Sequence, residues 1–218
     1  MREYQKIQTI FKRDEKGHIL LGDWSLPEFE YLQNNIWTFT EKVDGTNIRV
    51  IWNGENIIFA GKTDKAQIPA FLLQRLQEIF NKKQIFQNVF PLDNKVEVCL
   101  YGEGYGKGIQ KGENYIKDGV DFILFDILIG NIFLKREDIE DIALRFDIKV
   151  VPVVKEGTLN QMIDLVKNGF NSAWGDFIAE GIVARPKVEL RDRRGFRVIT
   201  KLKNKDFKIK EVEEVKDV

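Results

Sequence analysis

Three short stretches in the first third of the chain are rich in β-branched and aromatic residues and are separated by polar turn residues. Such stretches are typical of β-strands, and the dipeptides Asp44-Gly45 and Asn53-Gly54 between them are strong signals for tight hairpin turns. The pattern therefore predicts an antiparallel meander of three strands at residues 37–42, 46–52 and 57–62.

Helical periodicity marks four other stretches of the chain. Ser25, followed three residues later by Glu28, forms a capping-box pattern and predicts a short helix that runs to Tyr31. Pro69 opens the next predicted helix, close to the first-turn position that proline favours. The three longer predicted helices cover residues 69–80, 136–146 and 159–169.

Apolar runs between and after these helices predict further strands, one of them turning at Gly130-Asn131. The last ten residues predict a short charged helix or a frayed tail. Antiparallel strands with helices inserted between them indicate an α+β fold of mixed, mainly antiparallel sheets with flanking helices. The further strands are expected at residues 95–103, 121–129, 132–134, 150–154, 176–186 and 196–203.

The composition is that of an ordinary globular protein, with 43% of the 218 residues hydrophobic and 31% charged. No repeat or linker interrupts the chain, so we expect one domain over residues 1–218. No stretch resembles a signal peptide or a membrane span, which predicts a cytoplasmic protein with no membrane partner. Cys99 lies in an apolar run and is expected to be a buried hydrophobic residue, and a single histidine, His18, argues against histidine-rich metal sites.

The charge is balanced overall but uneven along the chain. From Arg185 to Lys208 there are ten basic residues against three acidic ones, a net charge of +7, so the remainder carries −7. A concentrated basic segment is typical of a protein that contacts phosphates, although a solvated lysine-rich face would have the same composition. Charge alone leaves both interpretations open.

Lys42 stands at the end of a predicted strand, where the following Asp44-Gly45 turn would hold it in place. A free lysine has a pKa near 10.4, so at neutral pH its amine is deprotonated about once in 10³ to 10⁴, a handicap of roughly 4–5 kcal/mol for a nucleophile. Partial burial and neighbouring cations, such as Lys201, Lys203 or a divalent metal, would reduce that handicap. Taken alone, the motif favours a hairpin that carries an exposed lysine over a nucleophile.

Three charged residues near the end of the chain lie in strand-like surroundings. Glu180 is flanked by aliphatic residues, and a buried carboxylate is costly unless it is paired or bound to a metal. Lys201 and Lys203 alternate in a predicted strand and so share one face, either as functional groups or as two solvated lysines.

Five short motifs in this order resemble those of the covalent nucleotidyltransferases, the superfamily of ATP-dependent DNA ligases, RNA ligases and messenger-RNA capping enzymes. The resemblance runs from about Glu41 to Lys203, and it implies the ATP-grasp-like adenylation fold of ligases, with ATP and Mg²⁺ or Mn²⁺ as cofactors. The motifs are EKVDGTN from Glu41, LYGEGYG around Glu103, LFDI around Phe125, EGIV from Glu180, and TKLK, which ends at Lys203.

The resemblance also implies a role for each matching residue. Lys42 would attack the α-phosphate of ATP and hold AMP through a phosphoramide bond, Glu103 would bind the ribose hydroxyls, and Phe125 would stack on adenine. Glu180 would hold the divalent metal. The other residues expected at the nucleotide are Glu41, Asn47, Lys62, Lys201 and Lys203, of which Lys201 and Lys203 would contact the α-phosphate and assist catalysis.

Within this superfamily the details favour RNA as the substrate. DNA ligases and capping enzymes have an arginine where this chain has Asn47, and the pattern here is similar to the branch of the second RNA ligase of phage T4 and the RNA-editing ligases. Arg49 on the same strand face would substitute for the missing arginine. Lys62 stands where related ligases tend to have arginine, and it keeps the positive charge but lacks the planar guanidinium that binds a phosphate through two hydrogen bonds. The alternatives are a minimal DNA nick ligase and a non-catalytic module that binds nucleic-acid ends.

DNA ligases and capping enzymes also carry an OB-type domain after the last motif, whereas only fifteen residues follow Lys203 here, so we expect no such domain. The chain would then work with an accessory protein, hold RNA ends or a nicked duplex with its own basic segment, or be less than a complete sealing enzyme. We expect that segment to form a hairpin that binds RNA phosphates through Arg185, Arg191, Arg193, Arg194 and Arg197. The sequence does not specify the oligomeric state.

Overall fold

A computed structural model describes residues 3–91 and 96–207 of the chain. These residues form two compact units, and the chain crosses between them after Gln5, after Lys42 and after Pro152. Of the described residues, the first unit comprises those from 3 to 5 and from 43 to 152, and the second comprises those from 6 to 42 and from 153 to 207. Each unit has its own sheet and its own hydrophobic core.

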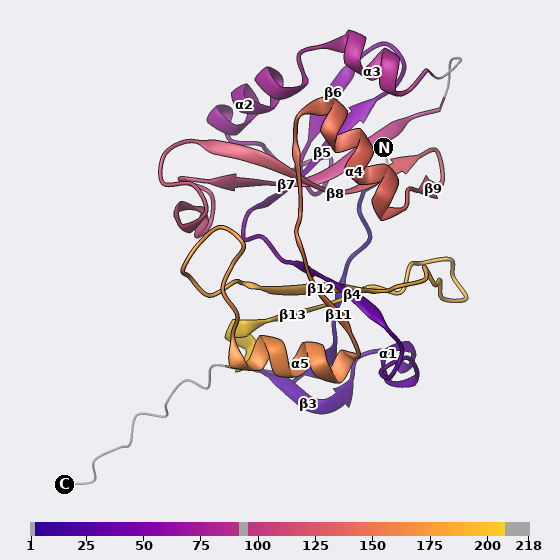
Figure 1. Ribbon diagram of the computed structural model, residues 1–218, viewed down its shortest axis with the longest axis vertical. Helices are drawn as coiled ribbons and strands as arrows, with labels where there is room; N and C mark the ends of the chain where they lie inside the picture. Colours follow the sequence, from indigo (N-terminus) through magenta and orange to yellow (C-terminus); the bar gives the residue numbers. More distant parts are fainter. Residues whose placement is uncertain (1–2, 92–95, 208–218) are drawn as a thin grey trace, which may run out of the picture. The chain divides into compact units, whose positions relative to one another are not determined.

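The first unit is built on an antiparallel sheet with one parallel edge strand, in the order β10-β8-β7-β5-β6, with β9 paired to β8. Helices α2, α3 and α4 lie along one face of this sheet (Figure 1), where they enclose a core that includes Leu76, Phe80 and Phe146. The strands are β5 (Thr46–Trp52), β6 (Ile57–Ala60), β7 (Val98–Gly106), β8 (Val120–Ile129), β9 (Ile132–Phe133) and β10 (Lys149–Val150); the helices are α2 (Ala70–Phe80), α3 (Lys83–Val89), the 3₁₀ turn η1 (Gly112–Asn114) and α4 (Arg136–Phe146).

The second unit contains a five-stranded sheet in the order β1-β13-β12-β4-β11 and a separate two-stranded sheet of β2 and β3. Helix α5 packs on β12 and β13 (Figure 1), and its apolar side joins a core that includes Trp37, Phe39 and Leu202. The strands are β1 (Gln8–Thr9), β2 (Phe11–Arg13), β3 (Ile19–Trp24), β4 (Trp37–Glu41), β11 (Val153–Gly157), β12 (Gly181–Pro186) and β13 (Thr200–Lys203); the helices are α1 (Pro27–Tyr31), α5 (Leu159–Asn168) and the 3₁₀ turn η2 (Asn204–Phe207).

The expected fold class is confirmed, and most of the predicted elements lie where the periodicity indicated. The Asn53-Gly54 turn does join two paired strands, β5 and β6, and the turn at Gly130 joins β8 to β9. Cys99 is buried as expected, and this burial raises the pKa of its thiol to about 12. The prediction for residues 209–218, and the start of the strand predicted from Lys95, lie outside the described residues.

The predicted three-stranded meander is wrong, because β4 does not pair with β5. Strand β4 pairs with β12 and β11 in the second unit, while β5 pairs with β6 and β7 in the first. At Gly45 the backbone passes so close to the carbonyl oxygen of Gly104 that a Cβ atom there would clash. The glycine of the Asp44-Gly45 pair is therefore required for close packing onto β7 rather than for a hairpin turn.

Three other local predictions need correction. The strand expected over residues 150–154 is two strands, β10 and β11, because Pro152 between them has no N–H to donate to a ladder. The capping box at Ser25 is absent, since the Ser25 hydroxyl donates to the carbonyl of Thr9 and the helix begins after Leu26. Helix α3 was not expected from the sequence.

The strands expected from residues 176 and 196 begin later than predicted, at Gly181 and Thr200. Residues 170–179 form a loop closed by hydrogen bonds between its own backbone groups, including the N–H of Ser172 and the carbonyl of Phe177. Glu180 therefore precedes β12 instead of lying inside a strand. Among the described residues, no helix is long and apolar enough to cross a membrane.

Candidate functional site

In the second unit, three neighbouring strands bring together Lys42, Glu180 and Lys203. Lys42 directly follows β4, Glu180 directly precedes β12, and Lys203 ends β13, and these three strands are adjacent and antiparallel. The N–H of Lys42 donates to the carbonyl of Gly181, so the backbone at the end of β4 is held against the start of β12.

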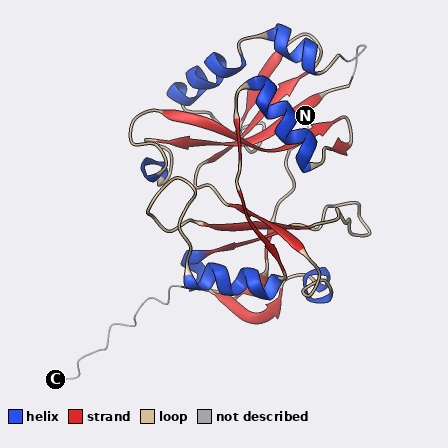
Figure 2. Ribbon diagram, viewed as in Figure 1, coloured by secondary structure: helices blue, strands red, loops and turns tan. Residues whose placement is uncertain are grey.

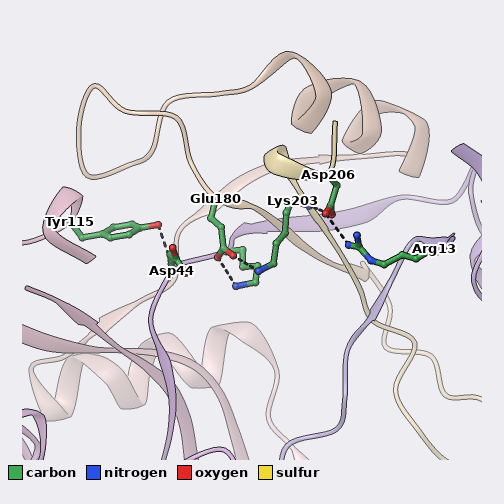
Figure 3. Close-up of polar contacts among 7 residues, drawn as sticks. Arg13, Asp44, Tyr115, Glu180, Lys203 and Asp206 are labelled. Carbon is green, nitrogen blue, oxygen red and sulfur yellow. Dashed lines mark hydrogen bonds and ion pairs between the residues drawn. The ribbon is translucent and has the colours of Figure 1, made fainter. Parts of the chain in front are cut away.

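The side chains of these residues form one ion-pair network. The Lys42 ammonium lies 2.6 Å from one carboxylate oxygen of Glu180, and the Lys203 ammonium lies 2.5 Å from the other. All three side chains are mostly buried, with exposed fractions of 21%, 12% and 24%. Figure 3 shows Glu180 and Lys203 directed toward each other. The carboxylate of Glu180 therefore neutralises part of the charge of two lysines.

Gly181 and Asp206 hold the strand ends that carry this network. A Cβ atom at Gly181 would clash with the carbonyl oxygen of Leu202 on β13, so the close approach requires glycine. Asp206 accepts a hydrogen bond from the N–H of Lys203 at 3.2 Å and pairs with Arg13 at 2.9 Å (Figure 3). The sequence contained no local signal for this contact, because Arg13 and Asp206 are 193 positions apart.

Glu41, the residue before Lys42, is buried at 2% exposure and accepts two hydrogen bonds. The hydroxyl of Ser172 donates to one carboxylate oxygen at 2.6 Å, and the N–H of Ala173 donates to the other at 2.9 Å. Desolvation raises the pKa of Glu41, and these two hydrogen bonds offset that effect in part. Glu41 thus fastens the loop before Glu180 to β4, a contact that the sequence did not reveal, and its expected contact with a nucleotide stays a prediction.

Lys201 lies two residues before Lys203 on β13, and the alternation of buried and half-buried residues along this strand confirms that the two lysines share a face. Lys201 is opposite Val183 in β12 and opposite Thr9 in β1, so it is on an inner strand of the sheet.

The basic segment forms the expected hairpin between β12 and β13 (Figure 2). Within it, Arg191 is opposite Arg197. Its arginines are not equivalent. Arg197 is buried and pairs with Glu189, which also pairs with Arg191, and Arg194 pairs with Asp192. Arg185 lies within β12, before the hairpin.

In the first unit, three predicted nucleotide-binding residues are neighbours on the sheet. Asn47 in β5 is directly opposite Glu103 in β7, and Glu103 is opposite Ile123 in β8, two residues before Phe125. Phe125 packs edge-on against Tyr4, with ring centroids 5.1 Å apart, beside a cluster that includes Tyr101. The side-chain oxygen of Asn47 is buried and accepts no hydrogen bond within the described residues.

Arg49 and Lys62 are linked through the turn that follows β6. The fully buried guanidinium of Arg49 donates to the carbonyl of Gly61 at 2.8 Å and to the carboxylate of Asp64 at 2.8 Å. These contacts hold the turn that contains Lys62. Arg49, which was expected to substitute for a nucleotide-binding arginine, therefore uses two of its donors to shape this turn.

Tyr115 is a further first-unit residue that the sequence did not single out. Its hydroxyl oxygen accepts a hydrogen bond from the N–H of Asp44 at 3.1 Å (Figure 3), and its ring packs edge-on against Tyr105. This contact holds the backbone two residues after Lys42 within the first unit.

A divalent metal at Glu180 would need most of its ligands from elsewhere. Within residues 3–91 and 96–207 there is no group of three or more histidine, cysteine, aspartate or glutamate side chains placed to bind one ion. Magnesium is commonly held by one or two carboxylates together with substrate phosphates and water, and a single glutamate beside two lysines fits that arrangement.

A family model described as RNA ligase matches residues 35–203 of this chain. No curated protein sequence matches the chain.

Among solved structures, the chain is similar to the RNA ligase of Naegleria gruberi. The structure of that enzyme with pyrophosphate is 20% identical with a TM-score of 0.62, and the match covers 92% of this chain and 61% of that one. A mutant of the same enzyme with AMP and manganese is 18% identical with a TM-score of 0.59, covering 89% and 61% of the two chains. These likenesses show a shared fold, and this chain spans about 61% of the length of that enzyme.

Proposed function

The chain belongs to the RNA ligase family, and we propose that it is an ATP-dependent RNA ligase that carries AMP on Lys42. In the first step the Lys42 amine forms a bond to the α-phosphorus of ATP, and pyrophosphate leaves as the amine loses a proton. AMP then passes to the 5′-phosphate of an RNA end, which frees Lys42. In the last step an RNA 3′-hydroxyl attacks that phosphate, the phosphodiester forms, and AMP leaves.

The observation that carries this proposal is the network of Lys42, Glu180 and Lys203. Nucleotidyl transfer depends mainly on positioning and on neutralising phosphate charge, and these residues offer a nucleophile, a second cation and a carboxylate at adjoining strand ends. In the structure Nζ of Lys42 donates a hydrogen bond to the Glu180 carboxylate at 2.6 Å, and this contact must separate before the nitrogen can attack phosphorus. Activation of Lys42 therefore requires the network to rearrange when ATP binds.

Glu180 is the residue that would hold Mg²⁺ or Mn²⁺, and the ion would supply positive charge to the phosphates of ATP. We assign contacts with the α-phosphate to Lys201 and Lys203, because both project from the same face of β13. Lys62, presented by the turn that Arg49 holds, is assigned to the phosphates as well.

Residues of the first unit are proposed to bind the nucleoside. Glu103 would accept hydrogen bonds from the ribose hydroxyls, and Phe125 would stack on adenine. The buried, unpaired oxygen of Asn47 opposite Glu103 supports a polar ligand at this place, since a buried acceptor without a donor is costly. Glu41 would contribute through the backbone, because its carboxylate is occupied by Ser172 and Ala173.

The substrate is proposed to be RNA ends or a nicked duplex. The hairpin after β12 supports this assignment through its exposed arginines, Arg191, Arg193 and Arg194, with Arg185 at its base. Buried Arg197 would orient the hairpin instead of binding phosphate directly. A cytoplasmic location and an accessory protein remain parts of the proposal, and we assign no oligomeric state.

The proposal is tested by incubating the protein with ATP labelled in its α-phosphate and Mg²⁺ and measuring covalent labelling. We expect one AMP per chain in the wild type, none in Lys42→Ala, and full labelling in Lys16→Ala, which removes an exposed lysine of the second unit. Labelling that persists in Lys42→Ala would overturn the assignment of the nucleophile.

Substrate choice is tested on nicked duplexes whose 3′-hydroxyl strand is either RNA or DNA. Faster sealing of the RNA strand supports the proposal, whereas preferential sealing of DNA would identify a minimal DNA ligase. Labelling by GTP in place of ATP would indicate a capping-type activity.

A further inference from the structure

The hairpin of residues 187–198 between β12 and β13, drawn in gold in Figure 1, has a defined conformation at its tip. The N–H of Asp192 donates to the carbonyl of Phe196, and the N–H of Gly195 donates to the carbonyl of Asp192. Gly195 has a φ of +82°, which a glycine adopts without strain. These hydrogen bonds between backbone groups close the turn at the tip of the hairpin.

Asp192 also fixes the side chains at the tip. One of its carboxylate oxygens accepts from the N–H groups of Arg194 and Phe196, and the other accepts from the Arg194 guanidinium at 2.8 Å. Partial desolvation raises the pKa of Asp192, but the hydrogen bonds from Arg194 and Phe196 outweigh it and hold that pKa below its ordinary value. Asp192 is therefore ionised at neutral pH.

Arg194 lies over the ring of Phe196, with its guanidinium carbon 5.3 Å from the ring centroid. The Phe196 side chain is still 47% exposed, although the neighbouring hairpin residues Arg197 and Val198 are buried. The tip therefore presents an aromatic ring and a planar cation next to each other. Nucleic-acid bases stack on both kinds of group when they are unpaired.

The hairpin carries a net positive charge, which is complementary to the phosphate backbone of a nucleic acid. It contains five basic residues and two acidic ones, and both acidic residues already pair within the hairpin. Within the described part of the chain, Arg193 forms no hydrogen bond and no ion pair, and it is exposed. An acidic protein would also complement the positive charge of the hairpin, but it would not account for the exposed Phe196 ring beside the Arg194 guanidinium.

We propose that Phe196 and Arg194 form a platform on which an unpaired base of the RNA substrate stacks, while Arg193 binds a neighbouring phosphate. This inference rests on the proposed RNA ligase function and names a contact with its substrate. Because the platform binds base faces, it is not selective for sequence, but it prefers single-stranded RNA to a duplex of the same sequence.

The test is to measure binding of a fluorescent RNA of about ten nucleotides, single-stranded or duplex, over a series of salt concentrations. Stacking of one base is worth about 1–3 kcal/mol, so Phe196→Ala should bind single strands about 5- to 150-fold more weakly. Phe196→Trp should retain binding, and Val188→Ala, which removes an exposed apolar side chain from the same hairpin, should have no effect.

Arg193→Ala should produce a different result. The logarithm of the RNA-binding constant falls linearly with the logarithm of salt concentration. Loss of one phosphate contact makes this fall shallower, by about 0.7 in slope for a single strand, whereas Phe196→Ala leaves the slope unchanged. Lys16→Ala removes an exposed charge elsewhere in the second unit and should leave the slope as in the wild type. A slope that is the same in Arg193→Ala would overturn the phosphate contact.

The platform is refuted if Phe196→Ala binds single strands within twofold of the wild type, or if it loses the same affinity for duplex RNA. Thermal unfolding of each variant identifies a loss of fold, and failure of Phe196→Trp to restore binding would also count against stacking. Labelling of Lys42 by ATP is measured separately. If the wild type forms no adduct while Phe196→Ala still weakens RNA binding, the proposed function fails and the platform stands.

Discussion

In the first unit three candidate residues stand on neighbouring strands of one sheet, whereas in the second unit the ion-paired candidates lie at the ends of strands. Asn47 and Glu103 are direct partners in paired strands, so their spacing is set by register. The side chains of Lys42, Glu180 and Lys203 meet through ion pairs at the ends of three adjacent strands. A residue inside a paired strand is suited to recognition, and charged groups at strand ends can rearrange during a reaction.

From this difference we propose that the two units have separate roles in the reaction. Changes in the second unit should lower the rate of AMP transfer, and changes in the first unit should weaken ATP binding with little effect on the rate. Two substitutions test this division, and two others test the burial of Glu41, in descending order of expected effect.

The largest effect is expected from Glu180→Ala, which removes the carboxylate shared by Lys42 and Lys203. Loss of a charged group that organises a transition state commonly costs 10²- to 10³-fold, so kcat for adduct formation should fall by about that factor. The measurement is single-turnover labelling at saturating ATP. Glu156→Ala, which removes an exposed carboxylate of β11 in the same unit, is the control and should be unaffected. A change confined to KM would contradict the division.

A smaller effect, on binding, is expected from Glu103→Ala. Its carboxylate is proposed to accept hydrogen bonds from ribose, and such a bond to a charged group is worth about 1.5–3 kcal/mol, or roughly a 10- to 150-fold rise in KM for ATP. The kcat should stay within about threefold of the wild type. Glu97→Ala, an exposed position just before β7, serves as the comparison. A fall in kcat with unchanged KM would assign Glu103 to chemistry instead.

The smallest effect is expected in stability, from Glu41→Gln. Burial raises the pKa of Glu41, so its contribution to stability is fully present below the unfolded pKa, near 4.5, and is lost as pH rises through the higher folded pKa. Glutamine does not ionise, so the Tm of the variant relative to the wild type should increase from pH 4 to pH 7. Thermal melts at both values measure this difference.

Ser172→Ala keeps the ionisable group of Glu41 and removes one of its donors. It should therefore lower Tm at pH 7 more than at pH 4, because the ionised carboxylate gains more from a hydrogen bond than the neutral acid does. A pH-independent difference in both variants would contradict the role given to burial.

Local patterns in the sequence predicted most elements and most candidate residues. Helices α2, α4 and α5 follow from periodicity, and the alternation around Lys201 and Lys203 predicted their common face. Which strands pair with each other was harder to predict from the sequence, because a dipeptide such as Asp44-Gly45 indicates only that the backbone bends there. Whether the next strand returns to the same sheet depends on which partner buries it best.

The sequence by itself determined the residue types: a lysine proposed as the nucleophile, a carboxylate, two alternating lysines and an arginine-rich hairpin. Their order along the chain was enough to indicate the superfamily. Only the tertiary structure decided which groups meet, since Lys42 and Glu180 are 138 positions apart and pair because β4 and β12 are neighbours. It also decided that Glu41 and Arg197 are buried and Phe196 is exposed, because burial depends on packing partners that are distant in the chain.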